Sequence, residues 1–206
     1  MRMRMAALAS TALITTLVLA GCGQNNDPGG MPGMDHGSSS SSPSSSEASG
    51  DFNAADEMFV TMMIPHHQQA IEMADLILGK DGIDERVVAL AQQIKDAQGP
   101  EIETMQGWLQ EWGLPSPDTS AGGMHGMDHG GGMMSEEDMT AMATATGVEA
   151  TRLFLQGMIE HHNGAITMAE AELDGGQNPN SLKLAQQVID GQRAEVVTMQ
   201  EMLNSL

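Results

Sequence analysis

The chain contains nearly the same segment twice, and this duplication limits the folds that it can adopt. The letters MIPHHQQAIEMA stand at residues 63–74, and MIEHHNGAITMA stands at residues 158–169. When the comparison is extended to 59–74 and 154–169, nine of sixteen positions are identical. Both copies place two adjacent histidines among methionines and other apolar residues that recur with a helical period.

A second pair of matching segments follows the first. Residues 90–109 and 184–203 are identical at eleven of twenty positions, and the offset between the copies changes only from 95 to 94 residues. We infer that one unit of two segments has been duplicated. Both units are rich in Ala, Met, Leu, Glu and Gln, which favour helices, and glycines mark a turn inside each unit. The sequence therefore predicts two helical hairpins.

The helix ends can be placed from capping residues and glycines. Asn180 or Ser181 is expected to cap the last helix, and Ser135 is expected to start a short extra helix before Gly147. The long helices are predicted over about 54–78, 84–111, 148–173 and 181–203. Two amphipathic hairpins can bury their apolar faces only against each other. The predicted fold is therefore all-α, a four-helix bundle made of two duplicated helical hairpins.

The N-terminal region has the features of an export signal. Two arginines precede a short apolar run, and the residues before Cys22 are small. We expect residues 1–21 to be a signal peptide and Cys22 to be lipidated, as in a bacterial lipobox. Residues 22–50 are rich in Gly and Ser and are expected to form a flexible tether. The protein is then expected to be exported and lipid-anchored at the cell envelope.

The bundle is expected to cover residues 51–206. Hairpin 1 spans about 51–112, a His/Met-rich loop spans about 113–134, and hairpin 2 spans about 135–206.

The chain has 28 acidic and 8 basic residues, a formal net charge of −20. This balance excludes nucleic acid as a partner, because phosphate binding needs basic surface. Cys22 is the single cysteine, so any soft metal ligand in the bundle must be methionine.

The histidine pairs stand at ligand spacing from methionines on both repeated helices. Met63 precedes His66 by three residues and His67 by four, and Met62 and Met73 fall on nearly the same stripe as His66. In the second copy the corresponding residues are Met158, His161, His162 and Met168.

The residue types at these positions favour a soft metal ion. A di-iron bundle uses Glu-x-x-His, but here the residue three before each pair is methionine. Zinc prefers thiolates or more histidines and carboxylates, and haem attachment needs a motif that the chain lacks. Thioether with imidazole suits Cu(I), or Ag(I) as its mimic. The alternative is structural, because methionine fills helical cores and buried histidine often only finds a hydrogen-bond partner.

Histidine and methionine also recur outside the helices. GMDHG appears at residues 33–37 and again at 126–130, and Met133 and Met134 follow shortly after. We expect no core for these methionines to fill, so the tracts are typical of metal capture, including Cu(II) through histidine. The candidate ligands in the tracts are Met34, His36, Met124, His125, Met127 and His129.

These motifs resemble those of the DUF305 family. The resemblance rests on Met63-Ile-Pro-His-His-Gln-x-Ala-Ile-x-Met-Ala74, on the following Leu-Ala-x-x-Ile, and on Gln-x-x-Glu-Ile-x-x-Met-x-x-Trp108. It covers about residues 51–206 and implies a ferritin-like bundle, export and, for some members, copper binding and copper resistance. For this chain, the resemblance implies that copper is bound by residues of the two repeated segments, namely His66, His67, Met63, Met73, His161, His162, Met158 and Met168.

The second copy departs from the first at two positions that bear on the site. Thr151 stands where the first copy has Asp56, and Gly157 stands where it has Met62. We therefore expect the second site to be weaker or differently built.

The function predicted from the sequence is capture, buffering or transfer of Cu(I) by an exported lipoprotein, and not catalysis. A copper donor or acceptor protein is a possible partner in this interpretation. Two alternatives stay open at this point: a metal-dependent oxidase on a ferritin-like frame, and a cell-surface interaction module that binds no metal.

Overall fold

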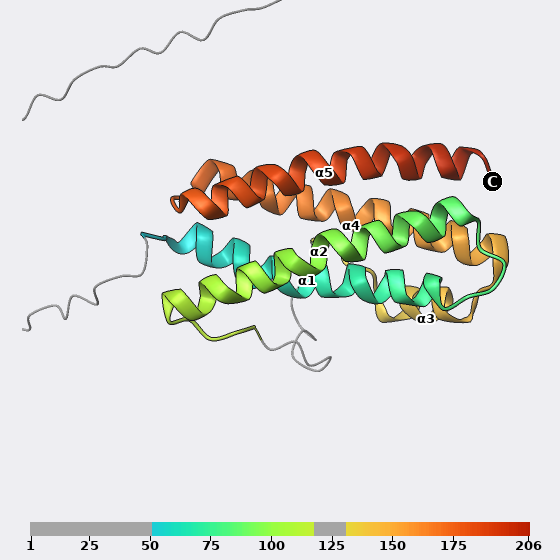
Figure 1. The fold of residues 1–206 in the computed structure, drawn as a ribbon, viewed down its shortest axis with the longest axis horizontal. Helices are drawn as coiled ribbons and strands as arrows, with labels where there is room; N and C mark the ends of the chain where they lie inside the picture. Colours follow the sequence, from blue (N-terminus) through green and yellow to red (C-terminus); the bar gives the residue numbers. More distant parts are fainter. Residues whose placement is uncertain (1–50, 118–130) are drawn as a thin grey trace, which may run out of the picture. The chain divides into compact units, whose positions relative to one another are not determined.

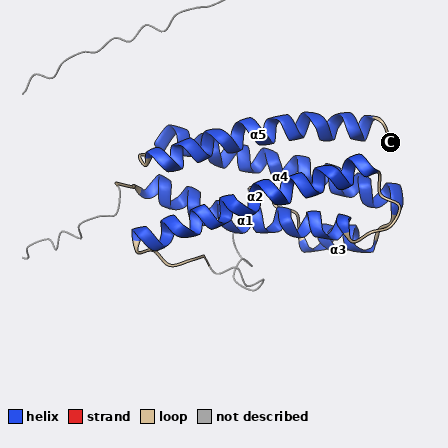
Figure 2. Ribbon diagram, in the orientation of Figure 1, coloured by secondary structure: helices blue, strands red, loops and turns tan. Residues whose placement is uncertain are grey.

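A computed structural model describes residues 51–117 and 131–206, and within these ranges the chain forms helices and no strand (Figures 1 and 2). None of the described helices is long and apolar enough to span a membrane. The predicted signal peptide, Cys22 and the tether lie outside the described residues. The helices are α1 (Ala54–Leu78), α2 (Glu85–Trp112), α3 (Glu136–Thr144), α4 (Gly147–Gly175) and α5 (Pro179–Asn204).

Side-chain caps explain where most of these helices begin. Asn53 and Asp56 form a capping box at the start of α1, and Ser135 accepts a hydrogen bond from the Asp138 N–H at the start of α3, as expected. The last helix begins earlier than expected. Asn178 caps it, and Pro179 occupies its first turn, where a missing N–H costs nothing.

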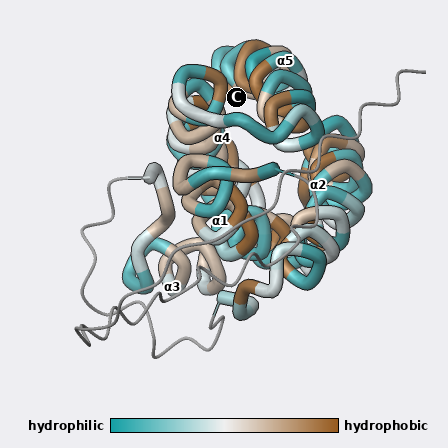
Figure 3. Tube along the Cα trace, turned by 90° about the vertical axis from the view of Figure 1, so that its left-hand side faces the viewer, coloured by the Kyte–Doolittle hydropathy of each residue, from teal (hydrophilic) through white to brown (hydrophobic). Residues whose placement is uncertain are grey.

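The four long helices form a bundle of two hairpins, which confirms the predicted fold. α1 packs against α2 and α4 packs against α5, while α1 and α4 form the seam between the hairpins. Seen from one end, the long helices surround a shared interior and α3 lies outside it (Figure 3). α3 contacts α4 and α1.

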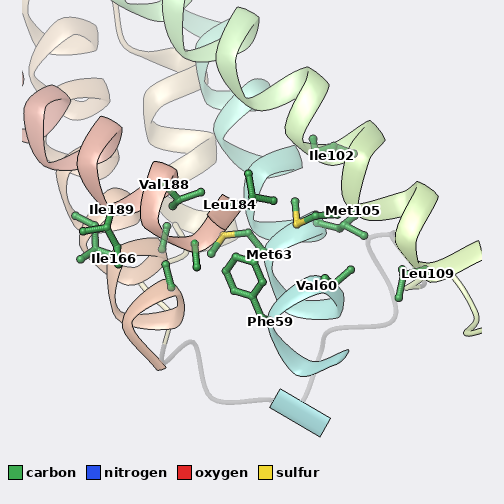
Figure 4. Packing of buried hydrophobic residues seen from close by; sticks show 14 of the residues in the cluster. Phe59, Val60, Met63, Ile102, Met105, Leu109, Ile166, Leu184, Val188 and Ile189 are labelled. Carbon is green, nitrogen blue, oxygen red and sulfur yellow. The ribbon is translucent and has the colours of Figure 1, made fainter. Parts of the chain in front are cut away.

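The apolar core consists of two clusters, one on each side of the middle of the bundle. The first joins the N-terminal half of α1 to the C-terminal half of α4, and Figure 4 shows Phe59 and Met63 at its centre. The second joins the C-terminal half of α1 to the N-terminal half of α4, including Met73 and Phe154. The two helices of the seam therefore run antiparallel, and the duplicated segments cross between the clusters.

One end of the bundle is closed by a buried carboxylate. Asp56 accepts hydrogen bonds from the backbone N–H groups of Gln177 (3.1 Å), Asn178 (2.8 Å) and Asn53 (2.7 Å), which fastens the start of α1 to the turn between α4 and α5. Glu172 is buried beside Asp56 and Ser181, but no partner of normal hydrogen-bond geometry reaches its carboxyl oxygens. Burial raises the pKa of Glu172 to about 7.

Candidate metal site

Four histidines form a layer where α1 and α4 cross. His66 and His67 come from α1, His161 and His162 come from α4, and each is at most 1% exposed. The rings of His66 and His161 lie against each other across the seam, with their centroids 3.7 Å apart and their planes inclined by 38°. The duplication therefore brings its two histidine pairs together in one place, between the apolar clusters.

The outer ring of each pair is held by a glutamate of the neighbouring helix. Nε2 of His67 lies 2.7 Å from Oε2 of Glu101 on α2, and Nε2 of His162 lies 2.8 Å from Oε2 of Glu195 on α5. A carboxylate only accepts, so Nε2 is the donor in each pair. Nδ1 of both rings is buried and has no hydrogen-bond partner. When the imidazole is neutral, Nδ1 therefore carries a free lone pair.

The inner rings differ between the two copies. Nε2 of His66 donates to the carbonyl oxygen of Gly131 at 2.7 Å, and its Nδ1 has no partner. No partner of normal hydrogen-bond geometry reaches either nitrogen of His161. Burial lowers the pKa of His66 to about 3 and holds the pKa of His161 well below its ordinary range. Both inner imidazoles are therefore neutral at physiological pH and able to bind a cation without first losing a proton.

Three of the predicted methionines lie in the core on either side of this layer. Met63, Met73 and Met158 are fully buried, and Met168 is partly buried against the first cluster. Met62 does not join them, because 49% of its surface is exposed. A helical stripe fixes the angle of a side chain on its own helix, but the neighbouring helices decide which flank is covered, and they leave the flank at Met62 open.

Most of the candidate residues outside the helices lie beyond the part of the chain that the structure describes. Met34, His36, Met124, His125, Met127, His129 and the lipidation site Cys22 lie outside the described residues. Met133 and Met134 are described, and the expectation that no core is available to these methionines is wrong for Met134. Its side chain packs against the second cluster, over Gly157.

The donors present favour a soft ion over a hard one. Within residues 51–117 and 131–206, no three His, Cys, Asp or Glu side chains come together in an arrangement that could hold a metal ion. What the middle of the bundle offers is imidazole nitrogen in pairs, with thioether sulfur nearby. Hard cations and zinc need more oxygen, nitrogen or thiolate ligands than this, whereas Cu(I) accepts few ligands and prefers soft ones.

Sequence reasoning missed the two glutamates, although a signal was available. Glu101 and Glu195 occupy equivalent positions in the two copies, like the histidines that they hold. Their surroundings differ. Gln93 of α2 donates to Oε1 of Glu195 at 3.0 Å, whereas Glu101 lines an open groove of about 510 Å³ between α2 and α5. The side chain of Glu101 is accordingly 24% exposed, against 12% for Glu195.

Comparisons with known proteins agree with this architecture. The family model described as "Domain of unknown function (DUF305)" matches residues 56–203. The crystal structure of a DUF305 fragment from Deinococcus radiodurans is 30% identical, with a TM-score of 0.66, and the match covers 75% of this chain and 98% of that one. A putative secreted DUF305 protein from Streptomyces coelicolor is 32% identical, with a TM-score of 0.65, over 73% of this chain and 91% of that one.

A further similar structure is that of CopM in a Cu(I)-bound form. It is 33% identical to this chain, with a TM-score of 0.60, and the match covers 73% of this chain and 96% of CopM. CopM is also known in Cu(II)-bound and Ag-bound forms. No curated protein matches the chain.

Proposed function

This chain belongs to the DUF305 family, and from that premise we propose that it is an exported copper-binding protein that holds Cu(I) in the histidine layer of its bundle. The ion is the cargo of the protein, which captures it, buffers it or hands it on. Similarity to CopM, which has Cu(I)-, Cu(II)- and Ag-bound forms, supports a role connected with copper.

The observation that carries the proposal is a set of five buried ring nitrogens that have no partner. They are Nδ1 of His66, His67, His161 and His162, together with Nε2 of His161. Leaving a buried polar atom unpaired costs about 1–3 kcal/mol, so native cores hold only a few such atoms and rarely gather them in one place. Five in one layer, in both copies of a duplicated unit, fit a layer that is completed by a ligand.

The chemistry of these nitrogens identifies the class of ligand. The inner imidazoles are neutral, so they present lone pairs, and Met63 and Met158 stand one helical turn before them on the buried side. A protein hydrogen-bond donor would satisfy such nitrogens singly, whereas one soft cation can accept the lone pairs of two rings together with those of thioether sulfur. The pairing of imidazole with thioether favours Cu(I), and Ag(I) is its closest chemical probe.

The proposal also places the protein at the cell envelope. The putative secreted DUF305 protein from Streptomyces coelicolor supports export. We add a lipid anchor on Cys22, a copper donor or acceptor protein as partner, and assistance from the His/Met tracts. Labelling with palmitate should mark the wild-type protein and leave Cys22→Ser unmarked; equal labelling of both would remove the anchor from the proposal.

The central experiment is a Cu(I) competition titration of the full chain with a chromophoric chelator under reducing conditions. One variant carries Ala at the four helix histidines, and a second carries Ser at Met124, His125, Met127 and His129. Tight binding is expected to disappear in the first variant and to persist in the second, with circular dichroism confirming that both remain helical. Unchanged affinity in the first variant would rule out the histidine layer as the binding site. Binding lost only in the second variant would show that the ion is held by the loop residues.

A further inference from the structure

Four residues before α3 cross the middle of the bundle beside His66, and we name Gly131–Met134 the strap. Its first carbonyl oxygen accepts the hydrogen bond from Nε2 of His66 at 2.7 Å. The backbone of the strap also lies directly on α4, because a Cβ added at Gly164 would overlap the Gly131 carbonyl oxygen. The strap is therefore packed against both helices of the seam at the histidine layer.

The two copies of the duplicated helix differ where the strap lies. α4 carries Gly157 and Gly164 at the positions where α1 carries Met62 and Gln69. A Cβ at Gly157 would overlap the terminal methyl group of Met134, and a Cβ at Gly164 would overlap the strap backbone. Small residues on α4 thus make room for the strap, which indicates a built contact rather than an incidental one.

Gln69 of α1 holds the other end of the strap. Its Nε2 donates to the carbonyl oxygen of Met134 at 2.8 Å, and its Oε1 accepts from the N–H of Met134 at 2.8 Å. One amide side chain therefore binds both backbone groups of one residue, as a strand partner would. The second copy has no equivalent of this clamp, since glycine stands at the matching position.

The contact with Gly131 decides which nitrogen of His66 is available. A carbonyl oxygen only accepts, so Nε2 of His66 carries the hydrogen and Nδ1 carries the lone pair. Glu101 and Glu195 impose the same assignment on His67 and His162. Outer partners of this kind fix the tautomer and orientation of metal-binding histidines. His161 has no such partner, so its ring is the only one of the four without a fixed tautomer.

We propose that Gln69 is a positioning residue for His66: by clamping Met134 it holds the Gly131 carbonyl against Nε2 and turns Nδ1 of His66 to the metal. As far as copper is concerned, this inference rests on the proposed function. The other part of the inference, that Gln69 sets the tautomer of His66, depends only on the hydrogen bonds of the strap and not on copper. The first copy is then the preorganised half of the site, and His161 of the second copy is the half that adjusts.

Two variants of the full chain loosen the strap from opposite sides. Gln69→Ala removes both hydrogen bonds to Met134, and Gly164→Ala pushes on the Gly131 carbonyl from α4. Each has a matched control. Gln68→Ala changes the neighbouring glutamine, which makes no hydrogen bond described for this structure, and Gly191→Ala adds a methyl group in α5, where nothing lies within 4 Å.

The readouts are the ring ¹⁵N chemical shifts of His66 in the metal-free protein and the affinity for Cu(I), with Ag(I) as the second probe. The wild type and both controls are expected to show His66 protonated at Nε2. Gln69→Ala and Gly164→Ala are expected to show mixed tautomers and an affinity lowered by about tenfold, as for other outer partners of metal-binding histidines.

Two results would separate the inference from the proposed function. If His66 keeps its Nε2 hydrogen in both variants, Gln69 does not position it and the inference is overturned. If the variants change the tautomer but the wild type binds neither Cu(I) nor Ag(I), the strap acts as inferred and the proposed function is wrong. An affinity loss without a change of tautomer would also overturn the positioning role.

Discussion

In the first hairpin, His66 donates to the strap and His67 donates to a glutamate at the edge of an open groove. In the second, His161 has no partner, and His162 donates to a glutamate that Gln93 covers. The ends of the bundle differ as well. Asp56 and Glu172 meet at one end, whereas the equivalent residues at the other are Thr151 and Ile77. The buried histidine pairs and the methionines that precede them are the same in both copies, and the divergence described here lies where loops, turns and solvent meet the helices.

The largest effects are expected from the buried methionines that precede each histidine pair. Met63→Leu and Met158→Leu keep the volume of the core, so each should cost less than about 1.5 kcal/mol of stability. If thioether binds the ion, each should weaken Cu(I) binding by roughly 100-fold, since a direct ligand matters at least as much as its outer partners. A chelator competition titration measures the loss.

Met142→Leu is the matched control, because Met142 is also fully buried but lies on α3. Equal affinity for Met63→Leu and Met142→Leu would make the first-copy thioether a core residue only. A loss confined to Met63→Leu would mean that the two copies differ in their ligands and not merely in their surroundings.

Smaller effects are expected from the glutamates. Glu101→Ala and Glu195→Ala leave a buried imidazole N–H without its acceptor, which costs about 1–3 kcal/mol, and should weaken Cu(I) binding by about 10- to 100-fold. The stability loss should be larger for Glu195→Ala, because Glu195 is less exposed and also receives Gln93. Thermal unfolding and the same titration measure both effects, with exposed Glu103→Ala as the control. A larger stability loss for Glu101→Ala than for Glu195→Ala would contradict the expectation that the more exposed glutamate is the less costly one to lose.

The smallest effect concerns the end of the bundle and depends on pH. The pKa of Glu172 is raised from 4.5 to about 7 in the folded chain, so the native state binds one more proton than the unfolded state between these values. Its contribution to stability is therefore full below pH 4.5 and is lost as the pH rises to 7. Glu172→Gln removes this loss and should stabilise the protein by on the order of 1 kcal/mol at pH 8 relative to pH 5.

Thermal unfolding of wild type and Glu172→Gln at the two pH values tests this prediction. Ser205→Ala, at the exposed C-terminal end of α5, serves as a control that should not change with pH. A gain that is the same at pH 5 and pH 8 would mean that Glu172 is not held protonated beside Asp56.

The sequence predicts the helices and singles out the histidine pairs as candidates, but it does not reveal the residues that hydrogen-bond to them. The helical period and the turn glycines predict α1 at its observed bounds, because these signals act between residues close in the chain. The partner of His66 is 65 residues away and that of His162 is 33 residues away, so only the packing of helices reveals them. Capping preference favours Asn180 or Ser181 as the start of the last helix, whereas Asn178 caps α5, because Pro179 can occupy the first turn without losing a hydrogen bond. The helical stripe groups Met62 with His66, but a stripe on one helix does not tell which neighbouring helices cover it, and Met62 is exposed.

The seam between α1 and α4 also sets the order in which the site can assemble. Contacts within a hairpin join residues that are near in the chain, whereas His66 and His161 are 95 residues apart. Because closing long loops costs entropy, local contacts form first, and the histidine layer is complete only after the hairpins have docked. An ion held by ligands from both hairpins would add its binding free energy to that docking step. Copper binding and the docking of the two hairpins would then be coupled equilibria, so that each would favour the other.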